Sequence, residues 1–455
     1  MASTYLTRAF SSGTITTKAT WSFWVKFSKI NQASGGASCM LFQARDANNS
    51  SNSRTYIRWG DGATLDFISY NSSGTIIAEY YTTRLLRDCN SWYHICYSVD
   101  TTLAAASDRV KLYINGVRET NFDTSNLTNP GVNQTIRTTS TVFTDISRNG
   151  GVNNNHLDGL LSYYIFTDGY TYQADTFGST DSVTGQWKIN TSPTVTYGTN
   201  GYFILKNGNS VTDQSGNSNN FTVGAGTLTN ASDCPDNVFA TWNPLAQILS
   251  SIGYEAGNTT IATSADVGQR QSISTLAAFS GKFYMECKLQ AIGSNVGGSY
   301  PYAGASPQSN FQGDTYTGNA SIGYGTTGYV YLNNNSGTNT GTTYTSGDII
   351  SVALDVTNSK IYFAKNGTYI SNGTGTGNPT TGANPFDISS LTSIDAMGFA
   401  TSLYNNNGVW QCNFGNGTFG TSTVSSAGTN ASSNGIFEYD VPTGYTALST
   451  KGLNL

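Results

Sequence analysis

The chain has 455 residues, which is too long for one ordinary domain and suits two domains of roughly 200 residues each. Its net charge is −5 and only 11% of its residues are charged, with no basic stripe, so the composition argues against a nucleic-acid partner held by phosphate contacts. No apolar run reaches the length that spans a bilayer, and we therefore expect no membrane insertion. Gly, Asn, Ser and Thr dominate and aromatic residues reach 12%, which predicts an all-β chain of strands and turns.

Alternating apolar residues predict strands throughout the first half of the chain. The first strong strand, residues 21–27, has aromatic side chains on both faces, which is typical of a central strand covered by a second layer. Asn115-Gly116 predicts a two-residue hairpin turn, because both residues tolerate a positive φ. Further strands are expected at residues 55–59, 65–70, 76–81, 92–99, 110–114, 157–166 and 201–205, with a single helical turn at 172–177. Turn signals about every ten residues favour a β-sandwich.

The second half is organised around residues 347–368, where two alternating apolar runs lead to Asn366-Gly367, another hairpin signal. Prolines and a shift in composition near residues 233–244 place the boundary there, and we predict two domains, residues 1–238 and 239–455. Other strands are expected at residues 282–289, 320–324, 328–332, 396–400 and 409–414, with a last edge strand at 435–442 in the C-terminal tail. The sequence therefore predicts two tandem antiparallel β-sandwiches.

Both halves resemble known families. The second half resembles the SPRY domains, which are binding modules without catalytic residues of their own. The motifs that carry this resemblance are Gly281 to Glu286, Ile322 to Tyr324, Gly347 to Ile350, Leu354-Asp355, Asn366-Gly367 and Asn413 to Gly415. The first half is more loosely similar to laminin-G-like and pentraxin-like jelly rolls, through Trp21 to Val25, Trp92 to Ile95, Asp108 to Gly116 and Asp158 to Leu160. The two resemblances imply concanavalin-like sandwiches that recognise a partner.

Joined in this order, with Trp242 to Leu245 between them and Pro442 to Tyr445 near the end, the halves resemble virion structural proteins of tailed bacteriophages. This resemblance implies a non-enzymatic protein of the tail fibre, spike or capsid decoration. Such a protein is located in the virion, contacts other virion proteins, forms a homo-oligomer and adheres to host-surface glycans. Two alternatives stay open: a secreted bacterial lectin or adhesin, and, with less support, a polysaccharide-degrading enzyme. We expect no classical export signal, because the N-terminus lacks its charged and apolar regions.

Candidate catalytic residues are few. Laminarinase-type glycosidases share the concanavalin-like sandwich and carry a Glu-x-Asp-x-x-Glu strand, whose two glutamates must lie about 5 Å apart for retaining chemistry. Glu438-Tyr439-Asp440 is the nearest match, but Thr443 stands where the second glutamate belongs. The two histidines, His94 and His156, fall in an alternating strand and an Asn-rich turn, without the companions that a triad or a zinc site needs. We therefore expect no catalytic residues.

One stretch offers ligands for a metal. Asp213 to Asn217, with Asn219, presents hard oxygens in a turn, which is the chemistry that calcium prefers. The same residue types also form turns by local hydrogen bonding, and the small number of carboxylates favours that interpretation. The six cysteines lie far apart with no Cys-x-x-Cys pair, so we expect reduced thiols. We predict no cofactor, and calcium near Asp213 stays open.

The candidate ligand-binding residues are four tyrosines in or next to loops of the second half, Tyr302, Tyr316, Tyr324 and Tyr404. Tyrosine has an apolar ring and a polar tip, so it can stack on a sugar face or anchor a partner. The alternative is that these rings pack the edges of the sandwich or a subunit interface. The sequence does not decide between the two.

Overall fold

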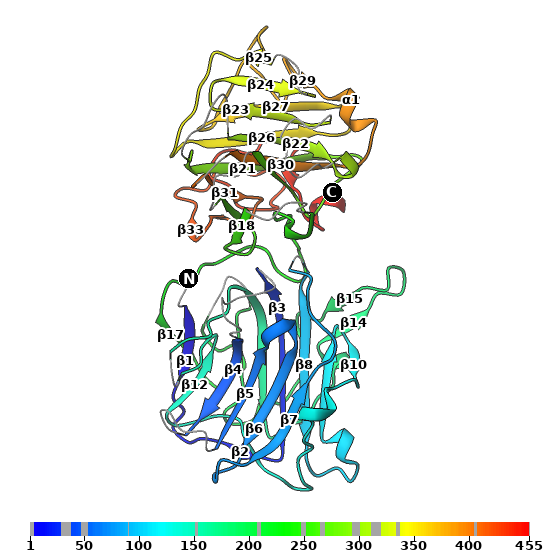
Figure 1. Cartoon of the computed structure of the whole chain (residues 1–455), viewed down its shortest axis with the longest axis vertical. Coiled ribbons are helices and arrows are strands. Elements are labelled where there is room, and N and C mark those ends of the chain that lie inside the picture. Colours follow the sequence, from blue (N-terminus) through cyan, green and yellow to red (C-terminus); the bar gives the residue numbers. More distant parts are fainter. Residues whose placement is uncertain are drawn as a thin grey trace. The chain divides into compact units, whose positions relative to one another are not determined.

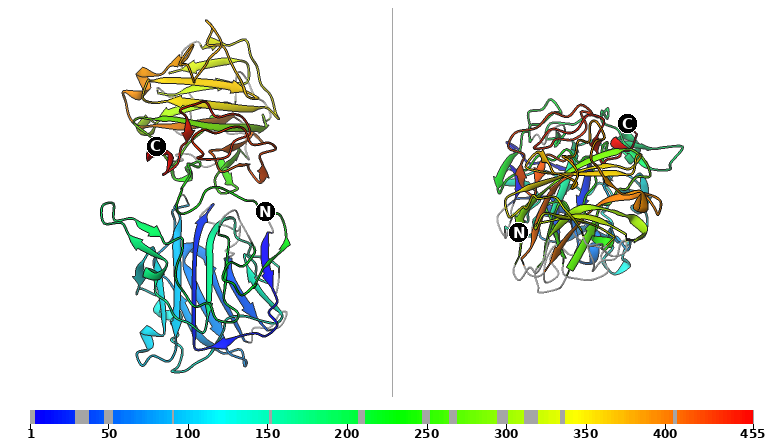
Figure 2. Two further views of the ribbon diagram at one scale, coloured as in Figure 1. Left: turned by 180° about the vertical axis from the view of Figure 1, so that it is seen from behind. Right: turned by 90° about the horizontal axis from the view of Figure 1, so that it is seen from above.

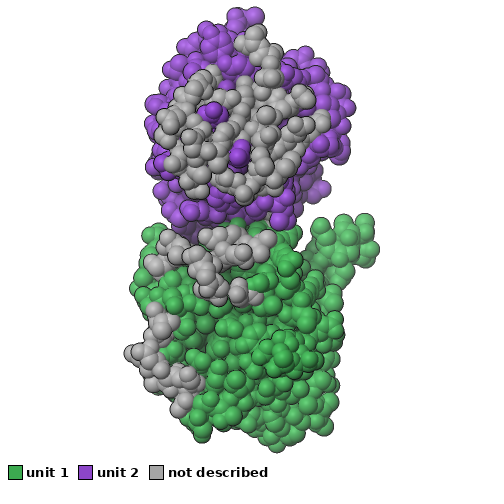
Figure 3. Space-filling view, in the orientation of Figure 1, with its two compact units in different colours: residues 1–228 green, residues 229–455 purple. Residues whose placement is uncertain are grey.

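The computed structural model describes residues 4–28, 38–46, 53–89, 91–150, 153–206, 211–246, 252–263, 269–293, 301–310, 320–333, 337–404 and 407–454. The chain divides into two compact units, residues 1–228 and 229–455 (Figure 3). This division falls earlier than the predicted boundary at residue 238. The reason is that the Thr229 hydroxyl and the Ser232 N–H already donate to the carbonyls of Thr421 and Asn416, which belong to the second unit.

The first unit contains two large antiparallel sheets (Figures 1 and 2). The seven-stranded sheet has the order β17 (Thr222–Ala225), β1 (Tyr5–Arg8), β12 (Phe143–Ile146), β4 (Cys39–Arg45), β5 (Arg54–Trp59), β6 (Leu65–Tyr70) and β7 (Ile76–Tyr81). The six-stranded sheet has the order β10 (Val117–Glu119), β9 (Val110–Ile114), β8 (Tyr93–Asp100), β3 (Lys18–Phe27), β13 (Gly159–Asp168) and β16 (Tyr202–Ile204). Two short pairs complete it, β2 (Ile15–Thr16) with β11 (Ile136–Arg137) and β14 (Gly178–Thr180) with β15 (Trp187–Ile189).

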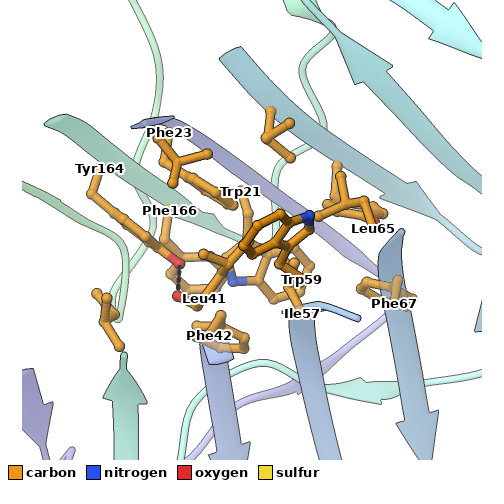
Figure 4. Close-up of a cluster of buried hydrophobic side chains, with 14 of the residues drawn as sticks. Trp21, Phe23, Leu41, Phe42, Ile57, Trp59, Leu65, Phe67, Tyr164 and Phe166 are labelled. Carbon is orange, nitrogen blue, oxygen red and sulfur yellow. Dashed lines mark hydrogen bonds between the residues drawn. The ribbon is translucent and has the colours of Figure 1, made fainter. Parts of the chain in front are cut away.

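The core of the first unit lies between these two sheets and is rich in aromatic rings (Figure 4). Trp21 of β3 lies against Phe42 of β4 and Phe166 of β13, with ring centroids 5.2 Å apart in both pairs. Tyr164 is fully buried, and its hydroxyl donates to the carbonyl oxygen of Leu41 at 3.0 Å, which satisfies the polar tip of an otherwise apolar side chain. Each side chain of this size contributes about 1.5–3 kcal/mol when it leaves water.

The second unit also has two large sheets (Figures 1 and 2). The nine-stranded sheet follows the order β18 (Ile252–Glu255), β19 (Thr260–Thr263), β31 (Val409–Asn413), β21 (Lys282–Ala291), β26 (Ile349–Asp355), β27 (Lys360–Lys365) and β28 (Thr368–Tyr369). Off this path, β29 (Phe386–Asp387) pairs with β27, and β34 (Thr446–Ala447) lies parallel to β21. The six-stranded sheet follows β20 (Gln269–Ile273), β30 (Met397–Tyr404), β22 (Tyr302–Pro307), β23 (Ile322–Gly325), β24 (Tyr329–Leu332) and β25 (Thr338–Asn339). A short helix, α1 (Ser389–Thr392), and the pair β32 (Thr418–Phe419) and β33 (Ser422–Thr423) complete the unit.

The outer face of the nine-stranded sheet is closed by the C-terminal cover, residues 436–447. Phe437, Val441 and Tyr445 of this segment pack against Tyr284 of β21 and Tyr362 of β27 in a second apolar cluster. We predicted an edge strand at residues 435–442, and this prediction is wrong. The N–H groups of residues 438 and 439 donate to the carboxylate of a buried glutamate on β21 and not to a neighbouring strand.

The predicted fold class is confirmed. Both units are antiparallel β-sandwiches apart from the short parallel pair of β21 and β34. The two predicted hairpin turns are present, with φ of 48° and 77° at Asn115 and Gly116 and of 48° and 81° at Asn366 and Gly367. The predicted helical turn is the 3-10 turn η4 (Ala174–Thr176).

Candidate functional site

The six-stranded sheet of the second unit presents an unusual outer face. Alternate residues Ala303, Ala305, Ile322 and Tyr324 point into the core, so their neighbours along β22 and β23 point outward. Strand register then places Gln271, Ser402 and Tyr302 in one row across β20, β30 and β22. The next row across β30, β22, β23 and β24 contains Ala400, Gly304, Gly323 and Tyr331.

These two rows, apart from Tyr331, line a small open hollow in which the space for the centre of a water molecule is only about 10 Å³. Gly304 and Gly323 leave backbone as its floor, and a side chain at Gly304 would come within 1.8 Å of the Ile322 carbonyl oxygen. Pockets that enclose a whole small molecule usually measure about 300–1,000 Å³. The hollow is therefore a shallow depression with room for about one water molecule, so a ligand would lie over its rim and not inside it.

Tyrosines form one wall beside the hollow. The ring of Tyr302 meets the ring of Tyr331 edge to face at 5.8 Å, and Tyr331 lies 6.0 Å from Tyr329. Tyr329 and Tyr331 are half-buried, which leaves part of each ring open. The hydroxyl of Ser402 has no hydrogen-bond partner among the described residues, although the side chain is only 1% exposed. A buried hydroxyl without a partner costs about 1–3 kcal/mol, and the Ser402 hydroxyl would gain a partner if a ligand or a water entered the hollow that it lines.

The four predicted tyrosines have different environments. Tyr302 lines the hollow and is 4% exposed. Tyr324 is fully buried in the core, where its hydroxyl donates to the Thr342 carbonyl at 2.6 Å, so its ring has no face for a glycan. Tyr404 is half-buried at the end of β30, and Tyr316 lies outside the described residues. Of the three predicted tyrosines that the structure describes, only Tyr302 lines the hollow.

His94 lies inside the first unit. Trp187 donates its indole N–H to Nδ1 at 3.1 Å, so Nε2 carries the proton that is donated to Ser22 Oγ at 2.9 Å. Burial lowers the pKa of His94 to about 3, which keeps the ring neutral. Its role is to fix the hairpin of β14 and β15 on the outer face of β8. His156 donates its Nδ1–H to the Ser147 carbonyl at 2.9 Å in a turn.

The Asp213 carboxylate stabilises a turn by accepting four hydrogen bonds from protein groups. Its Oδ1 accepts the N–H groups of Phe203 at 2.8 Å and Ser215 at 2.9 Å. Its Oδ2 accepts the Ser215 hydroxyl at 2.7 Å and the Asn219 N–H at 2.8 Å. A carboxylate has about four lone-pair directions, so these contacts leave none for calcium. Within the described ranges, no group of three His, Cys, Asp or Glu side chains could hold a metal ion.

The carboxylates of the glycosidase-like motif have structural partners. Glu438 accepts the N–H and the hydroxyl of Ser425, and Asp440 accepts the same two groups of Thr429, at 2.6 and 2.8 Å. Both side chains therefore hold residues 425–429 next to the C-terminal cover. All six cysteines are free thiols, and five of them are buried.

The comparisons with known proteins address both units. Residues 2–166 match the concanavalin A-like lectin/glucanases superfamily, and residues 297–380 match the SPRY domain. The chain therefore combines a concanavalin-like domain with a SPRY domain, as the motifs predicted. Both domain types are consistent with a role in binding or adhesion. No curated protein matches the chain closely enough to count as a relative.

Among solved structures, the chain is similar to the SPRY domain of human HERC1, with 14% identity, 35% of this chain and 91% of that chain covered, and a TM-score of 0.27. It is similar to another human SPRY domain, with 18% identity, 36% and 94% coverage and a TM-score of 0.27. It is also similar to the native heptameric SAP-like pentraxin of Limulus polyphemus, with 14% identity, 50% and 90% coverage and a TM-score of 0.29. In the described part of the chain, no helix has the length and apolar character needed to cross a membrane.

Sequence reasoning missed most of the hollow. Gln271, Gly304, Gly323 and Ser402 form it only because β20, β22, β23 and β30 pair side by side, and the paired residues Gln271 and Ser402 are 131 positions apart in the chain. The one available signal was the small-residue pattern Tyr302-Ala303-Gly304-Ala305, which permits close approach of another backbone.

Proposed function

We propose that this protein is a non-enzymatic virion structural protein of a tailed bacteriophage, part of a tail fibre, a spike or the capsid decoration. In this proposal the protein adheres to host-surface glycans, forms a homo-oligomer, and contacts other virion proteins. The virion setting is supported by the order of the motifs, a concanavalin-like half followed by a SPRY half, with Trp242 to Leu245 between them. The adhesive role is supported by the domain types and by the hollow on the second unit.

The observation that carries the adhesive role is the hollow itself. It combines a tyrosine wall, a backbone floor and the unpartnered hydroxyl of Ser402. A sugar ring has one apolar face and several hydroxyl groups, which suits an aromatic wall beside a free hydrogen-bonding group. A non-enzymatic role agrees with the structural partners of His94 and Glu438.

The virion assignment is tested by locating the protein. Mass spectrometry of purified phage particles, followed by imaging of the particle, should find the chain in many copies at a defined position. A purified chain that is strictly monomeric and does not associate with the particles would contradict this assignment.

The adhesive role is tested with Tyr331→Ala, which removes the half-buried wall of the hollow. The matched control is Tyr170→Ala, whose ring in the first unit is 44% exposed. We expect the Tyr331 variant to bind host surface polysaccharide about tenfold more weakly, because truncating an aromatic anchor costs on the order of 1–2 kcal/mol. Equal binding by both variants would show that the hollow does not bind the polysaccharide.

A further inference from the structure

The outer face of the seven-stranded sheet in the first unit concentrates arginine next to tyrosine. Ile57, Phe67 and Tyr80 point into the core, so the alternate residues of β5, β6 and β7 point outward. The outward residues include the arginine–tyrosine strip, which is Arg54, Tyr56, Arg58, Tyr70 and Tyr81. Arg45 of β4 lies opposite Arg54 in the register of the two strands. Figure 1 shows β4 to β7 side by side in this sheet.

The rings hold the guanidinium groups in fixed places. The Cζ atom of Arg54 lies 4.4 Å from the ring centroid of Tyr70 and 5.2 Å from that of Tyr56. Arg58 lies 5.6 Å from the rings of both Tyr56 and Tyr81. A guanidinium over an aromatic face is attracted by the ring while its N–H edge stays available for hydrogen bonds. The arginines of the strip are therefore oriented in advance.

Two carboxylates on this face pair with arginines other than Arg54. Asp66 accepts a hydrogen bond from Arg58 Nε at 2.7 Å, and Asp145 accepts from Arg148 at 2.7 Å. Arg54 forms no ion pair with any described residue, and its Nε is buried without a hydrogen-bond partner. A guanidinium without an anion in a part-buried place is uncommon, because desolvation of a charge needs a partner to offset it.

The local charge balance is positive around Arg54. Arg45 and Arg54 are directly opposite each other across β4 and β5, an arrangement that is destabilising for like charges. Burial lowers the pKa of Arg45, and the neighbouring charges of Arg54 and Arg148 lower it further, while Asp145 acts in the opposite direction. A bound anion near Arg54 would relieve both the repulsion and the missing hydrogen bond.

We propose that the arginine–tyrosine strip binds a carboxylate-bearing saccharide. The carboxylate accepts hydrogen bonds from the N–H edge of Arg54, and the sugar ring that carries it lies on the half-buried ring of Tyr70. Tyr81 is in the row of Asp66, four residues along β6 from Tyr70, and is placed for a later sugar unit of the same chain. Arg suits this ligand because its planar fork matches the two oxygens of a carboxylate. The site is on the first unit and is independent of the hollow proposed for the second.

A polyanion such as a nucleic acid fits this face less well. Asp66 on β6 lies opposite Arg58, and Glu79 on β7 accepts the Tyr81 hydroxyl at 3.2 Å. A phosphate backbone is continuous and would have to pass these carboxylates, whereas a saccharide can place one carboxylate at Arg54 and direct its other charges away from Asp66 and Glu79. The strip therefore favours a saccharide that brings one carboxylate to Arg54.

The test measures the affinity of the full chain by isothermal titration calorimetry. The four probes are oligogalacturonate, neutral maltohexaose, a heparin fragment and single-stranded DNA. We expect oligogalacturonate to bind and maltohexaose not to bind. Arg54→Gln should weaken oligogalacturonate binding about tenfold or more, because it removes a charge-assisted, two-pronged contact. Arg54→Lys keeps the charge without the fork and should give an intermediate loss. The matched control is Arg118→Gln on β10, which should bind like the unchanged chain.

Several outcomes would overturn the proposal. Binding that is unchanged in Arg54→Gln, equal binding of maltohexaose, or tighter binding of heparin or DNA than of oligogalacturonate would each do so. If Arg54→Gln unfolds, as judged by its melting temperature, Tyr70→Leu replaces it and should weaken the same binding. Failure of this proposal leaves the effect of Tyr331→Ala and the position in the particle unchanged, so the two proposals fail separately.

Discussion

The nine-stranded sheet of the second unit and the seven-stranded sheet of the first both turn one face away from their cores, yet they treat that face differently. On the nine-stranded sheet, Tyr284 and Tyr362 lie under the C-terminal cover, and Phe437 meets Tyr284 edge to face at 5.0 Å. On the seven-stranded sheet, arginines such as Arg54 and Arg58 lie over tyrosine rings instead. A face that the chain covers itself is apolar, whereas the strip combines cations with partly open rings.

The buried carboxylate of Glu286 joins the cover to its sheet. Its two oxygens accept the N–H groups of Glu438 and Tyr439, both at 2.8 Å, and Oε1 also accepts the Tyr284 hydroxyl at 3.1 Å. These contacts replace the strand pairing that residues 435–442 would otherwise need. The cover is thus anchored by one side chain and sealed by aromatic packing.

The largest expected effect comes from Phe437→Ala, which removes a ring that is 1% exposed from the cover. We expect the second unit to lose about 3–5 kcal/mol of unfolding free energy, since truncating a buried phenylalanine removes its transfer energy and leaves a cavity. Urea unfolding measures this loss. Tyr81→Ala on the half-buried strip is the matched control and should cost the first unit less than about 2 kcal/mol. A similar cost for both variants would contradict the contrast between a sealed and an open face.

The next effect is a pH dependence of the cover. Burial raises the pKa of Glu286 to about 7, although the N–H groups of Glu438 and Tyr439 oppose the shift. Because the folded pKa lies above the ordinary value of about 4.5, the stability that Glu286 contributes is full below pH 4.5 and is lost as the pH rises through 7. The stability of the unchanged chain relative to Glu286→Gln should therefore fall by roughly 3 kcal/mol between pH 4.5 and pH 8.

The melting temperatures of the two proteins across this pH range measure the difference. Glu255→Gln is the control, because Glu255 is exposed on β18 and should give a constant offset. A constant offset for Glu286→Gln as well would show that the carboxylate does not titrate with folding.

A third effect concerns the first unit, where the hairpin of β14 and β15 lies on the outer face of β8 and Trp187 contacts His94. Gly116→Ala would put a Cβ atom 2.3 Å from the Trp187 ring at a positive φ of 77°. Gly169→Ala has a similar φ of 82° and open space, so it isolates the backbone strain. We expect about 1 kcal/mol for Gly169→Ala and about 1–3 kcal/mol more for Gly116→Ala. Calorimetry that gives equal losses would show that the hairpin moves away freely.

Much of the fold could be predicted, because apolar and polar residues alternate along its strands and Asn-Gly marks two of its hairpin turns. The predicted strands 65–70 and 76–81 match β6 and β7 to the residue. The strand β4 was missed, since a bulge between Met40 and Phe42 buries Leu41 and Phe42 together and destroys the period of two. The Ser/Gly/Asn-rich sequence around β4 also resembled a plain connection.

The candidate sites were harder to predict than the strands. Tyr302 and Tyr324 lie on neighbouring strands, β22 and β23, and have similar local sequences. Which face each side chain takes depends on the alternation within its strand, which directs Tyr324 into the core and Tyr302 outward. The residues that lie beside Arg54 and Ser402 depend on the register between strands, which local sequence does not encode. Alternation therefore predicts that a sheet exists, whereas the residues that meet across it require the fold.

The smallest expected effect is the salt dependence of the unfolding free energy of the first unit. Arg45 and Arg54 repel each other on the strip, whereas Arg118 and Asp108 form an exposed ion pair at 2.8 Å on the same unit. Salt weakens both interactions, so raising NaCl from about 0.05 to 0.5 M should stabilise the unchanged chain relative to Arg54→Gln and destabilise it relative to Arg118→Gln. Each change should be about 0.5 kcal/mol or less, measured by urea unfolding at the two salt concentrations. Slopes of the same sign would mean that Arg54 already has an anionic partner, and the strip would then have no charge left for a saccharide.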